Sequence, residues 1–257
     1  MMLNIALIVI ILLELERYRC KENIFLFYNT TIYWYIIYIF NSIIYLIYYN
    51  KFKYEINNID IHKDFTKNHK KIIEELEDAL HLYNKINPGI FDSSFEQEND
   101  KYGYFFLYYY GKINTNICPT MREIIKKNKK LKTCFISIMD EELYIQEHRG
   151  PYAGLLRYHY TVLSSNSEED FLSLGNNKFF WKEKEGFLFD DTYRHFVEKK
   201  TNGMRISIIC DFKRDLIFPL NIINTLILNQ IPYKDHIKEL QIKCIPNRKN
   251  KIKIYND

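Results

Sequence analysis

The sequence HRGPYAGLLRYH, at residues 148–159, decides how the rest of the chain is organised. From Leu155 onward the pattern is typical of a β-strand, and the alternation places Arg157 and His159 on the same face. A guanidinium beside an imidazole favours a carboxylate ligand. His148 stands on the turn-rich approach to this strand and is a candidate metal ligand. The stretch therefore predicts a binding site, and the surrounding chain indicates its class.

The chain has 257 residues, a formal net charge of +4 and five cysteines without a Cys-x-x-Cys pair. This length is sufficient for one catalytic domain with an appendage. The cysteine pattern argues against a zinc ribbon and against a dense disulfide framework. Basic clusters at residues 126–130 and 248–253 come without zinc-finger spacing or an RNA-binding aromatic signature, so we expect solvated faces and no nucleic-acid partner. Contact with anionic membrane lipid is the alternative for the second cluster.

Residues 1–50 form a hydrophobic region that the charged patch at residues 14–22 interrupts. Residues 1–13 are apolar except for Asn4 and, at about 1.5 Å per residue, are short for a ~30 Å hydrocarbon core. Residues 24–49 contain no charged side chain and exceed the roughly 20 residues that a spanning helix needs. We expect a transmembrane helix there, in a single-pass or hairpin membrane anchor, with a buried core helix as the alternative. Basic residues flank the segment on both sides, so the side of the membrane that the domain faces stays open.

The segment after the predicted anchor begins with helices and continues as strands. Residues 67–83 place apolar side chains at helical spacing, within a helical lead-in over residues 51–100. Short apolar runs with turns between them then predict a mainly β protein with flanking helices, in which residues 101–216 form an antiparallel sandwich or jelly roll. Residues 217–257 are expected to form a C-terminal helix and a basic tail. The clearest strand predictions are residues 103–110, 134–139, 155–163 and 204–212, with a helix at residues 121–129.

Two histidines and an arginine form the chemical pattern of this β domain. His148 and His195 are far apart in sequence, each near a predicted strand end, and Arg205 follows shortly after the second. Imidazoles are suitable ligands for Fe(II), and an arginine pairs well with a carboxylate. The pattern suits a jelly-roll oxygenase that uses iron and 2-oxoglutarate.

Five motifs extend this pattern along the domain. They are YG followed by CPT at residues 110–120, ISIM at 136–139, HRGPYAGLLRYH at 148–159, FDDTYRH at 189–195 and RISIICDF at 205–212. In order and spacing, the span from about residue 103 to 216 resembles the aspartyl/asparaginyl β-hydroxylase family, which includes bacterial lipid A 2-hydroxylases. The resemblance implies a double-stranded β-helix, or jelly roll, behind an N-terminal transmembrane helix. The third motif and the predicted membrane anchor are most similar to the lipid-hydroxylase branch.

The resemblance also implies roles for individual residues. His148 and His195 correspond to the iron ligands, and Arg205 corresponds to the arginine that binds one carboxylate of 2-oxoglutarate. The implied cofactors are Fe(II), 2-oxoglutarate as cosubstrate and O₂. The polar groups around the cosubstrate correspond to Ser137, Arg157 and His159.

Gly150 departs from a common pattern of 2-oxoglutarate oxygenases. Many of them carry a carboxylate two residues after the first histidine, which completes a facial triad. The lipid-hydroxylase members tend to have Asp there, whereas animal aspartyl/asparaginyl hydroxylases have Gly and use two histidines. We therefore expect water to complete the iron site, with Asp190 or Asp191 as the alternative ligand. We expect Trp181 to pack between strands.

The resemblance implies an enzyme that hydroxylates an unactivated C–H bond. The expected reaction is β-hydroxylation of Asp or Asn residues in a protein substrate. The alternative within the class is 2-hydroxylation of a lipid acyl chain, which the predicted membrane segment favours. A third hypothesis is a non-catalytic, membrane-tethered binding module on the same jelly roll, and Gly150 is the feature that favours it.

Overall fold

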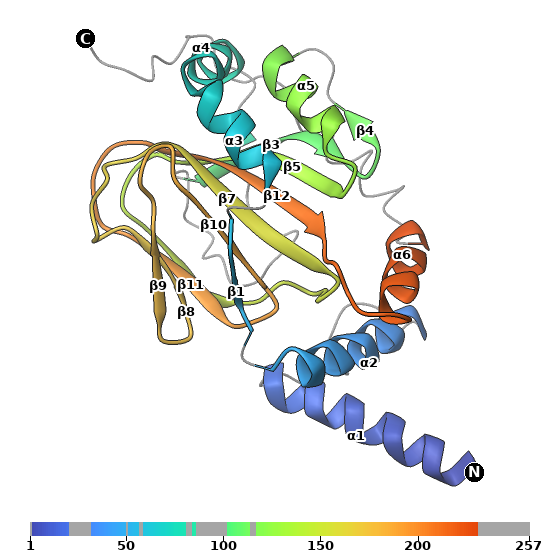
Figure 1. Ribbon diagram of the computed structural model, residues 1–257. Helices are drawn as coiled ribbons and strands as arrows, with labels where there is room; N and C mark the ends of the chain where they lie inside the picture. The colour runs from blue at the N-terminus through green and yellow to red at the C-terminus, as the bar shows by residue number, and fades with distance from the viewer. Residues whose placement is uncertain are drawn as a thin grey trace.

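The computed structural model describes residues 2–20, 32–49, 51–56, 59–80, 84–85, 102–113 and 117–230. Within these residues, two antiparallel β-sheets form the centre of the molecule (Figure 1). Helices α3, α4 and α5 lie together at one end of the molecule, and α1 and α2 lie at the opposite end with α6 beside α2 (Figure 1).

Strands β5 to β12 form a jelly roll. In the described residues the large sheet contains the strand order β10-β7-β12-β5, and the small sheet has the order β6-β11-β8-β9. The chain crosses from one sheet to the other at nearly every connection, which is the topology of a double-stranded β-helix. The predicted jelly roll is therefore confirmed. The strands are β5 (Leu131–Met139), β6 (Leu143–His148), β7 (Leu155–Leu163), β8 (Phe171–Leu174), β9 (Asn177–Phe180), β10 (Gly186–Phe189), β11 (His195–Lys199) and β12 (Arg205–Lys213).

Further strands extend the large sheet at both edges. β1 (Lys53–Tyr54) pairs with β10, and β3 (Tyr102–Tyr109) pairs with β5. β2 (Asn84–Lys85) and β4 (Lys112–Ile113) both pair with β3. The aromatic run predicted as a strand at residues 103–110 is thus β3, shifted by one residue.

The two faces of the large sheet have different partners. Because side chains alternate along a strand, β12 directs Ile206, Ile208 and Cys210 to one face and Arg205 and Ser207 to the other. The first face packs under α3 (Asp60–Lys67), α4 (His69–Ala79) and α5 (Pro119–Lys127) in one apolar core. The second face lies against the small sheet, where a separate core forms. This second core contains Tyr102, Met139, Leu143, Ile145, Leu172, Leu174, Phe179, Trp181, Phe187, Phe189 and Val197.

The helix predicted at residues 67–83 begins elsewhere in the structure. Residues 60–79 form two helices, α3 and α4, and Asn68 between them leaves the helical conformation with φ −102° and ψ 13°. The Asn68 side chain donates to the carbonyl oxygen of Asp64 at 2.8 Å, a local bond that competes with the helical ladder. Residues 81–83 lie outside the described residues.

The N-terminal region contains α1 (Met2–Cys20) and α2 (Ile32–Ile47). In the part of the chain that the structure describes, neither these helices nor any other is long and apolar enough to cross a membrane. Residues 24–31 of the predicted transmembrane helix and the basic tail at residues 231–257 lie outside that part. α2 buries Ile37, Phe40 and Ile44 against Tyr152 and against α6 (Leu220–Gln230), as the buried-helix alternative predicts.

Candidate active site

The two predicted iron ligands are neighbours across the small sheet. His148 is the last residue of β6, His195 is the first residue of β11, and the two are paired in register. Their ring centroids lie 4.3 Å apart. The fold therefore joins two histidines that are 47 positions apart in sequence.

The backbone fixes the tautomer of both rings in the same way. Nδ1 of His148 lies 2.8 Å from the carbonyl oxygen of Gln146, and Nδ1 of His195 lies 2.8 Å from that of Tyr193. A carbonyl oxygen only accepts, so Nδ1 carries the hydrogen and Nε2 carries the lone pair in each ring. Burial, and next the neighbouring His148, holds the pKa of His195 well below its usual range, so its imidazole is neutral. This is the state in which histidines bind a metal.

A second polar group lies on the inner face of the large sheet. Arg205 and Ser207 on β12, Ser137 on β5 and His159 on β7 are all buried there. Arg205 is 1% exposed, and its Nη2 donates to the Ser137 hydroxyl at 3.4 Å. Its Nε and Nη1 have no hydrogen-bond partner among the described residues, and the same holds for Ser207 Oγ and His159 Nδ1. Buried polar groups without partners are costly, so this cluster is suited to an anionic ligand.

Burial changes the protonation of this group. It lowers the pKa of Arg205 to about 10, which still leaves the guanidinium charged near neutral pH. It also holds the pKa of His159 well below the ordinary value, and the nearby charges of Arg205 and Arg157 act in the same direction. The cluster therefore combines one fixed positive charge with one neutral imidazole.

Aromatic rings connect the arginine cluster to the histidine pair. The Phe189 ring lies 5.5 Å from the His159 ring and 5.6 Å from the His195 ring, between centroids. Phe187 packs on His159 at 4.9 Å, and the Arg205 guanidinium lies 4.0 Å from the Trp181 ring centroid. Trp181 thus packs between strands as predicted, and it also supports the arginine through a cation–π contact.

Arg157 lies on the same face as His159 but binds carboxylates of the chain. Its Nη1 is 3.0 Å from the Asp191 carboxylate, and its Nε is 2.8 Å from that of Asp211. Burial would lower the pKa of Arg157, but the two carboxylates outweigh burial and raise it. The carboxylates of Asp191 and Asp211 already balance the charge of Arg157. Its role at the cosubstrate stays a prediction.

Asp191 also explains Gly150. A Cβ atom added at Gly150 would lie 2.3 Å from the Asp191 carboxylate, and Gly150 donates its backbone N–H to the Asp191 carbonyl at 2.7 Å. Burial raises the pKa of Asp191 to about 6, although Arg157 opposes the change. Across the described residues, no group of three or more His, Cys, Asp or Glu side chains is arranged to hold a metal ion. The site therefore has two histidines, and the Asp191 carboxylate lies against Gly150, two residues after His148.

These residues fit an iron ion and a dicarboxylate cosubstrate. The His148 and His195 Nε2 atoms are the nitrogens with lone pairs, and two adjacent imidazoles suit Fe(II). Arg205 is a buried cation whose Nε and Nη1 atoms have no partner within the described part of the chain, and a carboxylate would satisfy both.

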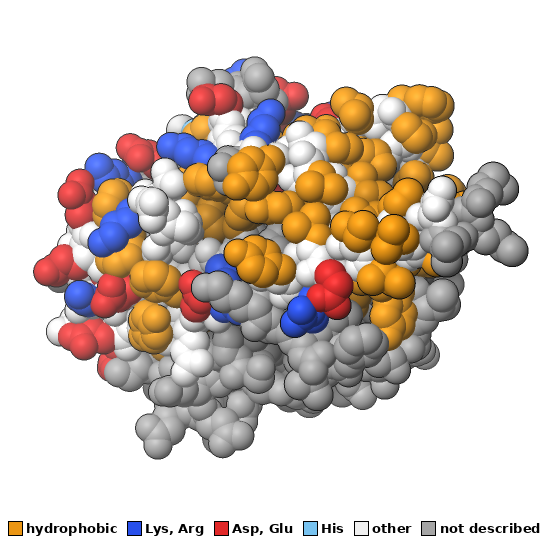
Figure 2. Space-filling model, turned by 90° about the horizontal axis from the view of Figure 1, so that it is seen from below, with side chains coloured by type: hydrophobic (Ala, Val, Ile, Leu, Met, Phe, Trp, Pro, Cys, Tyr) orange, Lys and Arg blue, Asp and Glu red, His pale blue; other side chains and the backbone are white. Residues whose placement is uncertain are grey.

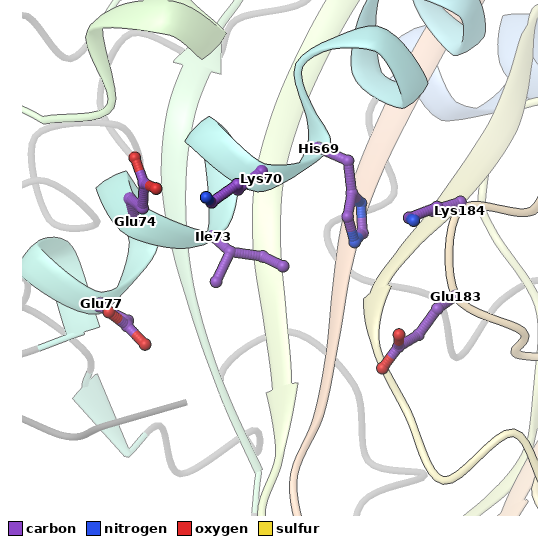
Figure 3. A pocket seen from close by; sticks show the side chains of 7 residues that line it. All are labelled: His69, Lys70, Ile73, Glu74, Glu77, Glu183 and Lys184. Atoms are coloured by element: carbon purple, nitrogen blue, oxygen red, sulfur yellow. The ribbon is translucent and has the colours of Figure 1, made fainter. Parts of the chain in front are cut away.

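A cavity of about 490 Å³ lies elsewhere, between α4 and the turn that follows β9 (Figure 3). Its lining is mostly charged, with Lys70 and Glu74 from α4 and Glu183 from the turn. His69 lines it as well and contacts the Tyr160 hydroxyl at 2.9 Å, on the outer face of the large sheet. The cavity is therefore on the opposite side of that sheet from Arg205.

A jelly roll that contains a histidine pair and a buried, partly unpaired arginine is the arrangement expected of iron- and 2-oxoglutarate-dependent hydroxylases. Comparison with known sequences gives the family. A sequence model described as aspartyl/asparaginyl beta-hydroxylase matches residues 66–215, more than half of the chain, and the chain belongs to this family. The predicted resemblance and the prediction of an enzyme are confirmed.

One relative is the ornithine lipid ester-linked acyl 2-hydroxylase of Rhizobium tropici. It is 29% identical over 139 residues, which cover 52% of this chain and 50% of that protein. The chain therefore matches about half the length of this relative.

Solved structures with some likeness to this chain are much more distant. An oxidoreductase of the 2OG-Fe(II) oxygenase family from Burkholderia pseudomallei has 11% identity and a TM-score of 0.38, over 60% of this chain and 91% of that one. A predicted oxalate decarboxylase from Thermotoga maritima has 11% identity and a TM-score of 0.31, over 44% and 81%. Likeness at this level assigns no function.

Several residues of the site were missed at the level of sequence. Asp211 and Ser207 lie in the predicted final strand, and the strand period from Arg205 indicates that they share its face. The sequence suggests Asp191 only as an alternative metal ligand, and it does not predict the ion pair of Asp191 with Arg157. No local signal indicates that Asp191 fills the space beside Gly150.

Proposed function

We propose that this protein uses iron(II) and 2-oxoglutarate to hydroxylate an unactivated C–H bond in the acyl chain of a membrane lipid. The observation that carries the reaction type is the position of the His148–His195 pair next to the Arg205 cluster. The relative from Rhizobium tropici, whose printed name is an acyl 2-hydroxylase, supports the lipid substrate.

The residues of the chain divide the work between them. When bound at the two imidazoles, iron supplies the activation of O₂, coupled to the oxidative decarboxylation of 2-oxoglutarate. The bonds from His148 and His195 to backbone carbonyls orient both rings. Arg205 and Ser137 bind one carboxylate of the cosubstrate, and the neutral His159 contributes a hydrogen bond. The Phe187, Phe189 and Trp181 rings pack against these groups and would exclude water from the reacting centre.

Hydroxylation of Asp or Asn residues in a protein is the second candidate. The family description names this activity, and Gly150 follows the two-histidine pattern that the animal hydroxylases show. A non-catalytic role has weaker support. The Asp191 side chain accounts for Gly150, and the chain has the buried cation Arg205 that a carboxylate cosubstrate needs.

A paired-substrate assay tests the proposal. The purified chain is incubated with Fe(II), 2-oxoglutarate and O₂, either with vesicles that contain an amino-acid-headgroup lipid or with a set of Asp- and Asn-containing peptides. Mass spectrometry then detects the gain of one oxygen atom, and succinate is measured in parallel. We expect an oxygenated acyl chain and succinate with the vesicles. Oxygenated peptides with unmodified lipid would replace the lipid proposal by the second candidate.

Matched variants test the site itself. His148→Ala and His195→Ala should abolish succinate formation and the weak visible absorption band of the anaerobic iron–2-oxoglutarate complex. His62→Ala is the control, because His62 lies on α3 and contacts the Tyr158 hydroxyl on the outer face of the sheet. A His148→Ala protein that retains wild-type turnover would refute the ligand assignment.

A further inference from the structure

Large exposed apolar side chains are concentrated at one end of the molecule. Figure 2 shows hydrophobic side chains gathered into a broad area on the face seen from below. Among the described residues, the exposed apolar side chains of α1, α2, α6 and the turn before α6 are Ile5, Leu7, Ile8, Ile10, Ile11, Ile36, Leu46, Ile47, Ile217, Phe218, Ile222, Ile223 and Leu226. We call this set the apolar face. An apolar area of this kind on a folded protein marks an interaction surface.

Residues 5–11 of α1 distinguish between possible partners of the apolar face. Ile5, Leu7, Ile8, Ile10 and Ile11 are each 55–57% exposed. At about 100° per residue these positions, together with the exposed Ala6, are spread around most of the helix circumference. A groove on a protein partner covers one side of a helix, whereas a helix that exposes apolar side chains around most of its circumference favours an apolar solvent around it.

We propose that the apolar face inserts into one leaflet of a lipid bilayer. Residues 5–13 of α1 contain no charged residue and, at about 1.5 Å per residue, span about 14 Å. This length is about half of a ~30 Å hydrocarbon core, which corresponds to one leaflet. Charge begins where the inserted part ends, with the exposed ion pair Glu14–Arg17 at 2.7 Å. Tyr18 follows, 81% exposed, and suits the interface between headgroups and acyl chains.

The three helices of the apolar face also hold the loop that follows His148. Glu16 of α1, 0% exposed, pairs with Arg149 at 3.1 Å. Asn41 of α2 donates to the Pro151 carbonyl oxygen at 2.9 Å and accepts from the Ala153 backbone N–H at 2.8 Å.

α6 completes this arrangement. Asn224 accepts from the Tyr152 hydroxyl at 2.7 Å and donates to the Gly154 carbonyl oxygen at 2.9 Å. A bilayer that contains the apolar face thus lies next to the loop between the first iron ligand and β7. This placement brings acyl chains near the proposed reaction centre, and only this last step rests on the proposed function.

Vesicle flotation tests the surface without any turnover. The full chain is mixed with vesicles of phosphatidylcholine, alone or with phosphatidylglycerol, at low and high salt. We expect flotation with both compositions and at both salt concentrations, because insertion of apolar side chains does not depend on counterions. The double variant Ile8→Glu/Ile11→Glu should lower the partition coefficient on the order of 100-fold, about tenfold for each isoleucine.

A matched control separates insertion from a general loss of structure. Tyr144→Glu removes an equally exposed side chain, 55%, from β6, which is not part of the apolar face. It should float like the wild type, and both mutant proteins should keep the wild-type thermal midpoint. Wild-type protein that stays unbound would refute the proposal, and so would a double variant that floats normally or wild-type protein that forms a dimer instead of binding vesicles. Succinate formation is measured separately, so failure of flotation with normal turnover rejects the surface alone, and flotation without turnover rejects the proposed reaction alone.

Discussion

Arg205 and Arg214 are both buried arginines, and their different surroundings lead to opposite predictions. Arg205 is 1% exposed; among the described residues it makes a long hydrogen bond to Ser137, and its guanidinium lies over the Trp181 ring. A buried charge of this kind costs several kcal/mol, against about 2 kcal/mol for a desolvated cation–π contact. In the absence of ligands, the free energy of unfolding of Arg205→Met should therefore equal that of the wild type or exceed it by up to about 3 kcal/mol.

The same substitution should impair binding of 2-oxoglutarate. Loss of a charge-assisted hydrogen bond, about 1.5–3 kcal/mol, corresponds to an increase of about 10- to 150-fold in the KM for 2-oxoglutarate. Urea denaturation of the metal-free protein gives the stability, and succinate formation over a range of 2-oxoglutarate concentrations gives the KM. Stability and cosubstrate affinity should thus change in opposite directions.

Arg214→Met is the control for this experiment. Arg214 is paired with the Asp190 carboxylate at 2.5 Å, and both side chains are at most 3% exposed. Its removal leaves a buried carboxylate without its cation, and we expect a loss of about 3–5 kcal/mol. If Arg205→Met destabilises the protein as much as Arg214→Met and leaves the KM unchanged, the inference that Arg205 binds a carboxylate of the cosubstrate is wrong.

Three further predictions follow from other contacts. Gly150→Ala places a methyl group against the Asp191 carboxylate, so we expect a loss of about 1–3 kcal/mol in thermal unfolding together with reduced succinate formation; unchanged values would contradict the packing. Burial and then Lys184 lower the pKa of His69 in the folded state, so the folded protein favours the neutral ring. The contribution of neutral His69 to stability is therefore present above pH ~6.5 and is lost as the pH falls toward the pKa of the folded state. His69→Gln should flatten the fall in stability between about pH 7 and 5 in urea titrations, and an unchanged slope would speak against it. Glu16→Gln weakens the buried pair with Arg149 and should cost about 3 kcal/mol in chemical denaturation, whereas no change would show that the pair is dispensable.

The jelly roll could be predicted from local patterns because each strand carries its own alternation. β7 matches its predicted bounds, and β12 begins one residue later than predicted. The alternation also predicts that Arg157 and His159 share a face, and the register with Asp211 and Ile209 of β12 agrees. What a single strand cannot indicate is the identity of its neighbour, because pairing depends on residues far away in sequence.

The histidine pair shows this limit. The sequence predicts His148 in a turn and His195 after a strand, whereas in the structure His148 ends β6 and His195 begins β11. Both strands carry the alternation of a half-buried strand, with Leu143 and Ile145 buried in β6 and Val197 in β11. They are only five or six residues long, and so short an alternation between turn residues is a weak strand signal.

Gly150 is better explained by its neighbour than by loss of function. Taken alone, glycine at the position of a triad carboxylate indicates a degenerate metal site. In the structure the space beside Gly150 is taken by the Asp191 carboxylate, which in turn pairs with Arg157. A side chain at position 150 would have to displace Asp191 and leave the partly buried Arg157 with one carboxylate fewer. Glycine at 150, Asp191 and Arg157 therefore form one interdependent arrangement, and the two-histidine site is a consequence of how β6 and the loop before β11 pack together.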